Sequence, residues 1–146
     1  LMDNLGLTVW ESLPTVDKKL RDAGLRDRIK LIASGKMVNP SGVAAALCLG
    51  ADSVNTARGF MFALGCIQAL QCNENTCPTG ITTHNPKLQK GLDPTVKSTR
   101  VANYATSMHE EVRLIAHSCG VLDPRALSAK HAFTISAQGA PEPLLD

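Results

Sequence analysis

Three of the five cysteines fall within one short stretch, where they could bind a metal together. The run is Cys66-x5-Cys72-x4-Cys77, and Pro78 follows the last cysteine. The surrounding residues are rich in Asn, Thr, Pro and Gly, which is typical of a loop, so no helix or strand would hold the three thiols apart. The spacing therefore predicts a metal site on a cysteine loop.

The number of thiols leaves two kinds of metal group open. A structural zinc ion takes four ligands, commonly from close cysteine pairs, and the nearest candidate for a fourth ligand is His84. An iron–sulfur cluster with three irons needs one thiolate for each iron, and a cysteine followed by a proline ends the cysteine run of bacterial ferredoxin loops. The residues thus favour an iron–sulfur cluster on Cys66, Cys72 and Cys77, with zinc on these three and His84 as the alternative.

Cys48 and Cys119 differ from these three because each lies in apolar surroundings. Cys48 falls in the run Ala-Ala-Leu-Cys-Leu, and Cys119 falls on the apolar side of a predicted long helix. Unpaired cysteine is among the most buried residue types, so we interpret both as core residues without chemistry. A total of five cysteines also argues against a disulfide framework and favours a reducing compartment, which we expect to be the cytoplasm.

Two glycine turns could bind an anion. Ser34-Gly35-Lys36 and Ala57-Arg58-Gly59 each lie between a predicted strand and a predicted helix. Such turns present backbone N–H groups, and Lys36 and Arg58 would add positive charge. In a (β/α)8 barrel, the loops after the last two strands commonly bind a phosphate. Either turn taken alone could be an ordinary connection between a strand and a helix, but two in succession, each with a basic residue and followed by a cysteine loop, favour an anion site.

The elements around these turns alternate between helix and strand. Apolar periodicity and turn residues predict, in order, a helix over 8–24, a strand over 29–33, a helix over 41–49, a strand over 52–56 and a helix over 60–64. This βα alternation predicts a parallel sheet. Two parallel strands leave unpaired edges, so we expect the missing strands upstream of Leu1 or in a partner chain.

Caps and glycines fix where the helices begin and end. Asn39-Pro40 and Asp93-Pro94 each place an N-cap residue before a proline, which favours a helix start. Gly24, Gly50 and Gly120 stand where a helix C-cap glycine belongs. The helix from Asp93-Pro94 to Gly120 carries an apolar stripe made of Val101, Ala105, Met108, Val112, Ile115 and Cys119. A brief turn at 123–124, a last strand over 132–135 and a polar tail follow.

Composition excludes several classes of protein. Of the 146 residues, 44% are hydrophobic and 19% are charged, which is the balance of a folded globular protein. The net charge of +2 comes from well-mixed signs without a basic run, so we expect no nucleic-acid partner. No apolar run is long enough to span a membrane, and we expect no membrane partner.

The most specific stretch of the sequence resembles a known family. It consists of Ala57-Arg58-Gly59-Phe60-Met61-Phe62-Ala63-Leu64-Gly65-Cys66-Ile67, then Cys72, then Asn75-Thr76-Cys77-Pro78-Thr79-Gly80-Ile81. It is similar to the FMN-binding, iron–sulfur domain of glutamate synthases, above all to their short FMN-binding relatives without an amidotransferase domain. The resemblance runs from about Gly24 to about Gly120.

The resemblance implies a fold and two cofactors. It implies the C-terminal part of a (β/α)8 TIM barrel, its last two βα units, with FMN at the C-terminal face and a 3Fe–4S cluster beside it. Position by position, Cys66, Cys72 and Cys77 match the cluster ligands. Ser34, Gly35 and Lys36 match the turn after strand seven, and Ala57 and Arg58 match the turn after strand eight; together these turns hold the FMN phosphate. We therefore divide the chain into barrel units (1–65), a cluster loop (66–84) and a helical extension (85–146).

The implied activity is reduction of a 2-imino or 2-oxo acid. In this family the reaction forms glutamate from 2-oxoglutarate, with electrons that an external donor protein or domain supplies through the cluster. The family's substrate residues come mostly from strands upstream of Leu1, so the catalytic residues stay unknown and we expect this chain alone to be inactive. The alternative is a zinc-stabilised structural or interaction module.

Overall fold

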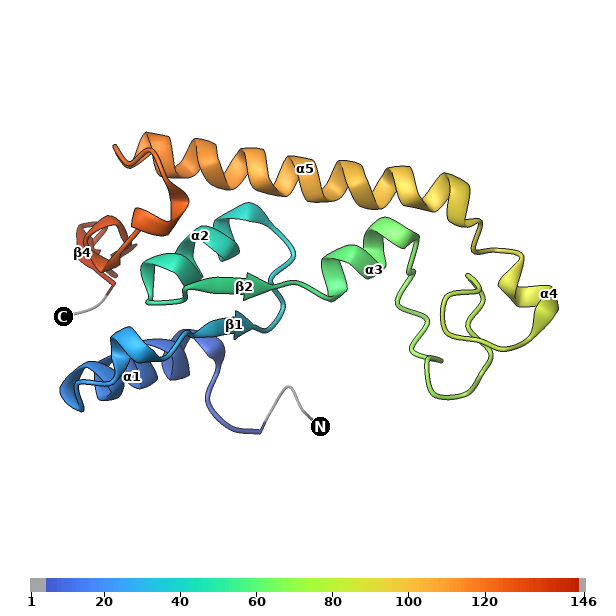
Figure 1. The fold of residues 1–146 in the computed structure, drawn as a ribbon, viewed down its shortest axis with the longest axis horizontal. Coiled ribbons are helices and arrows are strands. Elements are labelled where there is room, and N and C mark those ends of the chain that lie inside the picture. The colour runs from blue at the N-terminus through green and yellow to red at the C-terminus, as the bar shows by residue number, and fades with distance from the viewer. Residues whose placement is uncertain (1–4, 145–146) are drawn as a thin grey trace.

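The computed structural model describes residues 5–144, a set of short strands packed against helices (Figure 1). Residues 1–4 and 145–146 lie outside the described residues. They are the outer ends of the predicted barrel units (1–65) and of the predicted helical extension (85–146). The first half contains α1 (Val9–Asp22), the 3-10 turn η2 (Arg26–Arg28), β1 (Ile32–Ser34), α2 (Pro40–Cys48), β2 (Ser53–Asn55) and α3 (Arg58–Leu64). The second half contains α4 (Pro86–Gln89), α5 (Pro94–Ser118), η3 (Pro124–Ala126), η4 (Ala129–His131), β3 (Phe133–Ile135) and β4 (Pro141–Pro143).

β1 and β2 form a parallel pair, with α2 as the crossover between them. Ile32 lies opposite Ser53, and Ser34 lies opposite Asn55. This confirms the predicted α/β arrangement of parallel strands, although each strand is only three residues long. Because the pairing is parallel, the chain leaves both strands at the same edge of the sheet, as the two arrows in Figure 1 show.

The predicted helix boundaries are confirmed by their hydrogen bonds. Asn39 Oδ1 accepts a hydrogen bond of 2.8 Å from the Gly42 N–H at the start of α2. Asp93 Oδ1 accepts one of 2.9 Å from the Thr95 N–H at the start of α5. Gly24 and Gly120 follow α1 and α5 with φ of +65° and +79°, the left-handed conformation that glycine adopts without a steric penalty.

The 25-residue helix α5 runs along one side of the molecule, over α2 and α3 (Figure 1). Met108 and Val112 of its predicted apolar stripe are buried, and Ala116 joins them. Ala116 packs with Cys48 in a cluster that Cys119 also contacts, which confirms both cysteines as core residues. Burial, and then the neighbouring Cys119, raise the pKa of the Cys48 thiol. Within residues 5–144, no helix is both long enough and apolar enough to cross a membrane.

Several elements differ from the sequence-based expectations, α4 among them, which the sequence analysis did not predict. The strand predicted at 29–33 begins later, at Ile32, because the residues before it form η2 and its exit. The helix predicted at 60–64 begins earlier, at Arg58. The tail after β3 turns back at Gly139 and pairs antiparallel with it as β4, an element the sequence analysis did not predict.

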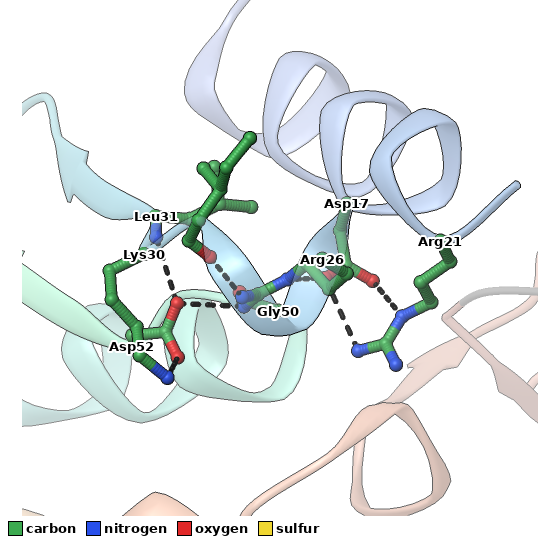
Figure 2. A network of polar contacts seen from close by, with 8 residues as sticks. Asp17, Arg21, Arg26, Lys30, Leu31, Gly50 and Asp52 are labelled. Carbon is green, nitrogen blue, oxygen red and sulfur yellow. Dashed lines mark hydrogen bonds and ion pairs between the residues drawn. The ribbon is translucent and has the colours of Figure 1, made fainter. Parts of the chain in front are cut away.

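Arg26 joins α1, η2 and the start of β2 through a network of polar contacts (Figure 2). Its guanidinium lies 2.5 Å from Asp17 Oδ1 and 2.8 Å from Asp52 Oδ2. It also donates hydrogen bonds to the carbonyl oxygens of Gly50, at 2.7 Å, and Ile29, at 2.8 Å. The Arg26 side chain is only 11% exposed, so these partners satisfy it almost without water.

The network lowers the pKa of both carboxyl groups that it contains. Burial raises the pKa of Asp17, but hydrogen bonds and charge from Arg21 and Arg26 outweigh it, so the pKa lies below its ordinary value. For Asp52, burial likewise raises the pKa. Hydrogen bonds from the Leu31 N–H and from Arg26 outweigh burial, so the pKa of Asp52 also lies below its ordinary value. The Leu31 N–H donates to Asp52 Oδ2 at 2.8 Å, which ties the start of β2 to the residues that lead into β1.

Replacing Arg26 should therefore destabilise the fold. Arg26→Ala removes a donor from two carboxylates and two carbonyl oxygens, and we expect it to lower the free energy of unfolding by about 2–4 kcal/mol. Chemical denaturation followed by circular dichroism measures this loss. Lys18→Ala, which removes an exposed ion pair with Asp22, is the matched control and should change stability by less than about 0.5 kcal/mol. Equal effects of the two substitutions would contradict the assigned role of Arg26.

Candidate functional site

The turn after β1 is held in a conformation that few residues adopt. Gly35 has φ of +140° and Lys36 has φ of +55°, a left-handed conformation that is uncommon outside glycine. Met37, only 2% exposed, anchors the turn in the core formed with α1 and α2. Ser34, Gly35 and Lys36 are themselves exposed, so the core fixes the backbone of a turn that faces outward.

The turn after β2 leads directly into α3. Ala57 is the N-cap residue of α3, Arg58 is its first residue, and both side chains are exposed. Gly59 is buried, and a Cβ there would collide with the Tyr104 hydroxyl and come within 2.9 Å of Thr56 Oγ1. Glycine at 59 therefore lets α3 pack directly on α5.

Tyr104 of α5 contacts both turns. Its hydroxyl donates a hydrogen bond of 3.2 Å to the carbonyl oxygen of Val38, just after the first turn. Its ring meets Phe60 of α3 edge to face, with centroids 5.0 Å apart and planes at 81°. A single side chain thus links the exits of β1 and β2, which the parallel register already places at one sheet edge.

The cysteine loop begins where α3 ends. Gly65, with φ of +103°, caps α3, and Cys66 follows it. In Figure 1 the loop lies at the far end of the molecule from α1 and leads into α4. All three cysteines are free; Cys66 and Cys77 are half-buried and Cys72 is exposed. The Gln68 N–H lies 3.5 Å from Cys66 Sγ and donates to it.

Hydrogen bonds between Asn75 and residues 83–84 close the second half of the loop. The Thr83 hydroxyl donates to the Asn75 carbonyl oxygen at 2.7 Å, and the His84 N–H donates to Asn75 Oδ1 at 2.5 Å. Gln89 Nε2 of α4 donates to the Thr83 carbonyl oxygen at 3.0 Å. Thr83 is only 8% exposed, so the two bonds that it makes are partly shielded from water. We call these contacts the Asn75–Thr83 clasp; it holds Cys77 inside a closed loop.

Two threonine hydroxyls surround the Cys77 sulfur. Thr79 Oγ1 lies 3.4 Å from Cys77 Sγ. Hydrogen bonding from the Thr79 hydroxyl, followed by that from the Thr82 backbone N–H, lowers the pKa of the Cys77 thiol to about 6. The buried Thr82 Oγ1 lies close to this sulfur but completes no hydrogen bond with any described residue. A sulfur with negative charge, as in a metal-bound thiolate, would give this hydroxyl the acceptor it lacks.

The donor chemistry at Cys77 therefore fits a metal-bound thiolate. The arrangement of the three thiols is a separate matter: within residues 5–144, no three His, Cys, Asp or Glu side chains are grouped so that they could hold a metal ion. The ligand set Cys66, Cys72 and Cys77 thus stays a prediction, as does His84 as the fourth ligand of zinc.

Comparison with known proteins identifies the family. Residues 1–122 match the model of a conserved region in glutamate synthase, which is most of the chain. The chain belongs to the glutamate synthase family. The match covers both turns, the cysteine loop and the whole of α5, so it spans every part of the candidate site.

Individual relatives of the glutamate synthase family agree with this assignment. A glutamate synthase large subunit-like protein of Bacillus subtilis, YerD, is 47% identical over 140 residues, which cover 96% of this chain and 27% of the relative. An archaeal glutamate synthase [NADPH] of Methanocaldococcus jannaschii is 37% identical over 82% of this chain and 23% of the relative. The chain thus spans about a quarter of the length of these relatives. Their names indicate a family of oxidoreductases.

Sequence reasoning missed three residues of the candidate site. Tyr104, the chain's single tyrosine, lies between Val101 and Met108 of the predicted stripe, so its inward direction could have been inferred. Asn75 and Thr83 gave no such signal, because their bonds join residues eight positions apart in an irregular segment.

Gly80 supplies a test of how tightly the loop is packed. It has φ of +80°, and a Cβ there would collide with the Leu88 carbonyl oxygen and lie 3.1 Å from the Leu92 nitrogen. We expect Gly80→Ala to open the loop at a cost of about 2 kcal/mol or more, from backbone strain plus the clash. Amide hydrogen exchange of residues 75–92 measures this opening.

Gly120→Ala is the matched control, because Gly120 has φ of +79° and a Cβ there would meet no other atom within 4 Å. This variant should lose only about 1 kcal/mol of stability, the cost of placing alanine in a left-handed backbone conformation. Amide hydrogen exchange in residues 75–92 should stay unchanged. Faster exchange in that segment for both variants, or for neither, would contradict the packing assigned to Gly80.

Proposed function

We propose that this protein acts as an FMN- and iron–sulfur-dependent oxidoreductase of glutamate synthase type. When bound, FMN and a 3Fe–4S cluster would supply the electrons that reduce a 2-imino acid, formed from a 2-oxo acid and an amino group with loss of water; with 2-oxoglutarate the product would be glutamate. One observation carries the proposal: in a chain of this family, two turns leave a parallel sheet at the same edge, and the second leads through α3 into a three-cysteine loop.

The two turns are the proposed site for the FMN phosphate. Backbone N–H groups of Ser34 and Gly35 suit a phosphate, since the exposed turn keeps its backbone accessible. Lys36 and Arg58 supply positive charge, and the fork of Arg58 suits two phosphate oxygens. Tyr104 supports this assignment, because it fixes the first turn against the helix that follows the second.

Cys66, Cys72 and Cys77 are the proposed ligands of the cluster. The chemistry at Cys77 supports this assignment, since the hydroxyls beside it stabilise a thiolate. The Gln68 N–H beside Cys66 supports it in the same way. When bound, flavin and cluster would supply the electron transfer, and the protein would supply position and electrostatics.

A TIM barrel is the proposed fold of the whole protein. Among the described residues, β2 pairs only with β1. In a two-stranded parallel sheet, the outer side of each strand has no neighbouring strand to hydrogen-bond with. Beside β2 lies an apolar groove of about 760 Å³, whose lining includes Val54, Phe60 and Met108. Further strands would cover both features. The last two βα units of a (β/α)8 barrel meet these requirements, with α3 and α5 on the outside.

Partners and location follow from the same proposal. The substrate is a small 2-oxo acid, and a donor protein or domain supplies the electrons. We place the reaction in the cytoplasm, where free thiols persist. Since the chain spans about a quarter of its relatives, we assign substrate binding to other parts of the protein and expect residues 1–146 alone to be inactive.

The cysteine ligands can be tested by metal analysis of the full-length protein. Purified without oxygen, it should contain iron and acid-labile sulfide and show the EPR signal of a cluster. Cys66→Ser, Cys72→Ser and Cys77→Ser should each lose most of the iron, because a three-iron cluster needs all three thiolates. Cys119→Ser is the control and should keep the iron, because Cys119 lies away from the loop in a core cluster.

Zinc in place of iron in this metal analysis would contradict the proposal. Stoichiometric zinc without iron, lost on His84→Ala, would establish the alternative of a zinc-stabilised module.

The phosphate turns can be tested by comparing FMN with riboflavin. Arg58→Ala and Lys36→Ala should each weaken FMN binding by about 10- to 100-fold, since hydrogen bonds to charged groups contribute about 1.5–3 kcal/mol. Riboflavin lacks the phosphate, so its affinity should not change. Fluorescence titration of the flavin-free, full-length protein measures both constants.

Lys30→Ala is the matched control for these variants. Lys30 has the same side chain as Lys36 but precedes β1, at the opposite sheet edge, where it lies 3.4 Å from Asp52. It should leave FMN affinity unchanged. Equal weakening by Lys30→Ala and Lys36→Ala, or loss of riboflavin and FMN affinity together, would contradict a phosphate site at the two turns.

A further inference from the structure

We propose that Tyr104 is a positioning residue for the anion site at the two turns. Its hydroxyl sets the separation between the turn after β1 and the turn after β2, and so places Lys36 and Arg58 around one phosphate group. The inference rests on the proposed function and deepens it, because it assigns the geometry of that site to a side chain that need not touch the flavin. Tyr104 lies on α5, outside both turns.

The Tyr104 hydroxyl contacts the segments of both turns. It donates a hydrogen bond of 3.2 Å to the carbonyl oxygen of Val38, two residues after Lys36. The same hydroxyl lies against Gly59, the residue after Arg58, where a Cβ atom would collide with it. One oxygen atom thus contacts the exit of the first turn and the second turn, and each contact is within two residues of a cation.

The Tyr104 ring is itself held in place. It meets the Phe60 ring of α3 edge to face, with centroids 5.0 Å apart. The side chain is half-buried, and α5 packs along α2 and α3. Because α3 holds the ring while the hydroxyl is bonded to Val38, the exit of the first turn is kept at a fixed distance from the start of α3, where Arg58 lies.

The first turn needs such a restraint because its backbone is strained. Lys36 has φ of +55°, a conformation that is costly for a residue with a Cβ atom. Residues persist in such conformations where the surrounding structure holds them. The burial of Met37 is one restraint, and the bond between Val38 and Tyr104 is another. Removing the hydroxyl takes away the second restraint, so we expect the turn to sample other conformations.

A phosphate is sensitive to such movement, because donors from both turns must reach its oxygens at the same time. A hydrogen bond weakens steeply once the donor leaves the usual range of about 2.7–3.2 Å from the acceptor. The flavin ring is not assigned to these turns. Loss of the Tyr104 hydroxyl should therefore weaken the binding of FMN and spare that of riboflavin, which lacks the phosphate.

The test is a fluorescence titration of the flavin-free, full-length Tyr104→Phe variant with FMN and with riboflavin. The substitution keeps the ring that contacts Phe60 and removes only the hydroxyl. FMN should bind about 3- to 10-fold more weakly than it binds the wild type, the range that one neutral hydrogen bond corresponds to, and riboflavin affinity should not change. Circular dichroism should show that the variant is folded at the temperature of the titration.

Ser98→Ala is the matched control. It also removes from α5 a hydroxyl that donates to a backbone carbonyl, but this bond, of 2.9 Å to the Thr95 oxygen, lies within the helix. The affinities for FMN and riboflavin should both equal those of the wild type.

A double-mutant cycle tests whether Tyr104 acts through the first turn. Tyr104→Phe should weaken FMN binding less in a Lys36→Ala background than in the wild type, because the charge that the hydroxyl positions is then absent. Equal weakening in the two backgrounds would contradict action through that turn.

Two further outcomes separate this inference from the proposed function. If the wild type prefers FMN to riboflavin but Tyr104→Phe keeps the wild-type FMN affinity, or loses affinity for both flavins equally, this inference alone is overturned. If the wild-type, full-length protein binds FMN no more tightly than riboflavin, the phosphate site of the proposed function fails, and this inference fails with it.

Discussion

The parallel register of β1 and β2 is the constraint on which the site depends. Because Ser34 lies opposite Asn55, the two exposed turns leave the sheet at one edge, and the chain after the second turn continues into α3 and the cysteine loop. Two strands of three residues cannot hold this register by their own hydrogen bonds. Contacts from both ends of the pair must hold it instead.

Those contacts come from opposite edges and have different chemistry. At the edge where the strands begin, Arg26 and Asp52 connect the chain entering β1 with the chain entering β2 by charge and hydrogen bonds. At the edge where they end, Tyr104 connects the two exits by one hydrogen bond and one ring contact. Charged groups thus connect the two strands where they begin, whereas an aromatic side chain connects them where they end.

Local signals explain how much of this could be predicted from sequence. The caps at Asn39 and Asp93 act over two or three residues, so the boundaries of α2 and α5 could be inferred correctly. Asn85-Pro86 repeats the same signal before α4 and was overlooked. β4 begins and ends with proline, which local propensity opposes, and only its pairing with β3 makes it a strand. The Asn75–Thr83 clasp and Tyr104 depend on contacts between distant residues, which no local pattern specifies.

The cysteine loop combines restrained and less restrained parts. Cys66 is fixed by the end of α3 and Cys77 by the clasp, whereas hydrogen bonds of residues 67–74 reach no further than five positions along the chain. The three thiols are not grouped in this structure, so bringing them to one metal group needs movement chiefly in that middle segment, with Cys72. A site of this kind would keep the electrostatic surroundings of Cys77 constant while the exposed Cys72 completes the ligand set.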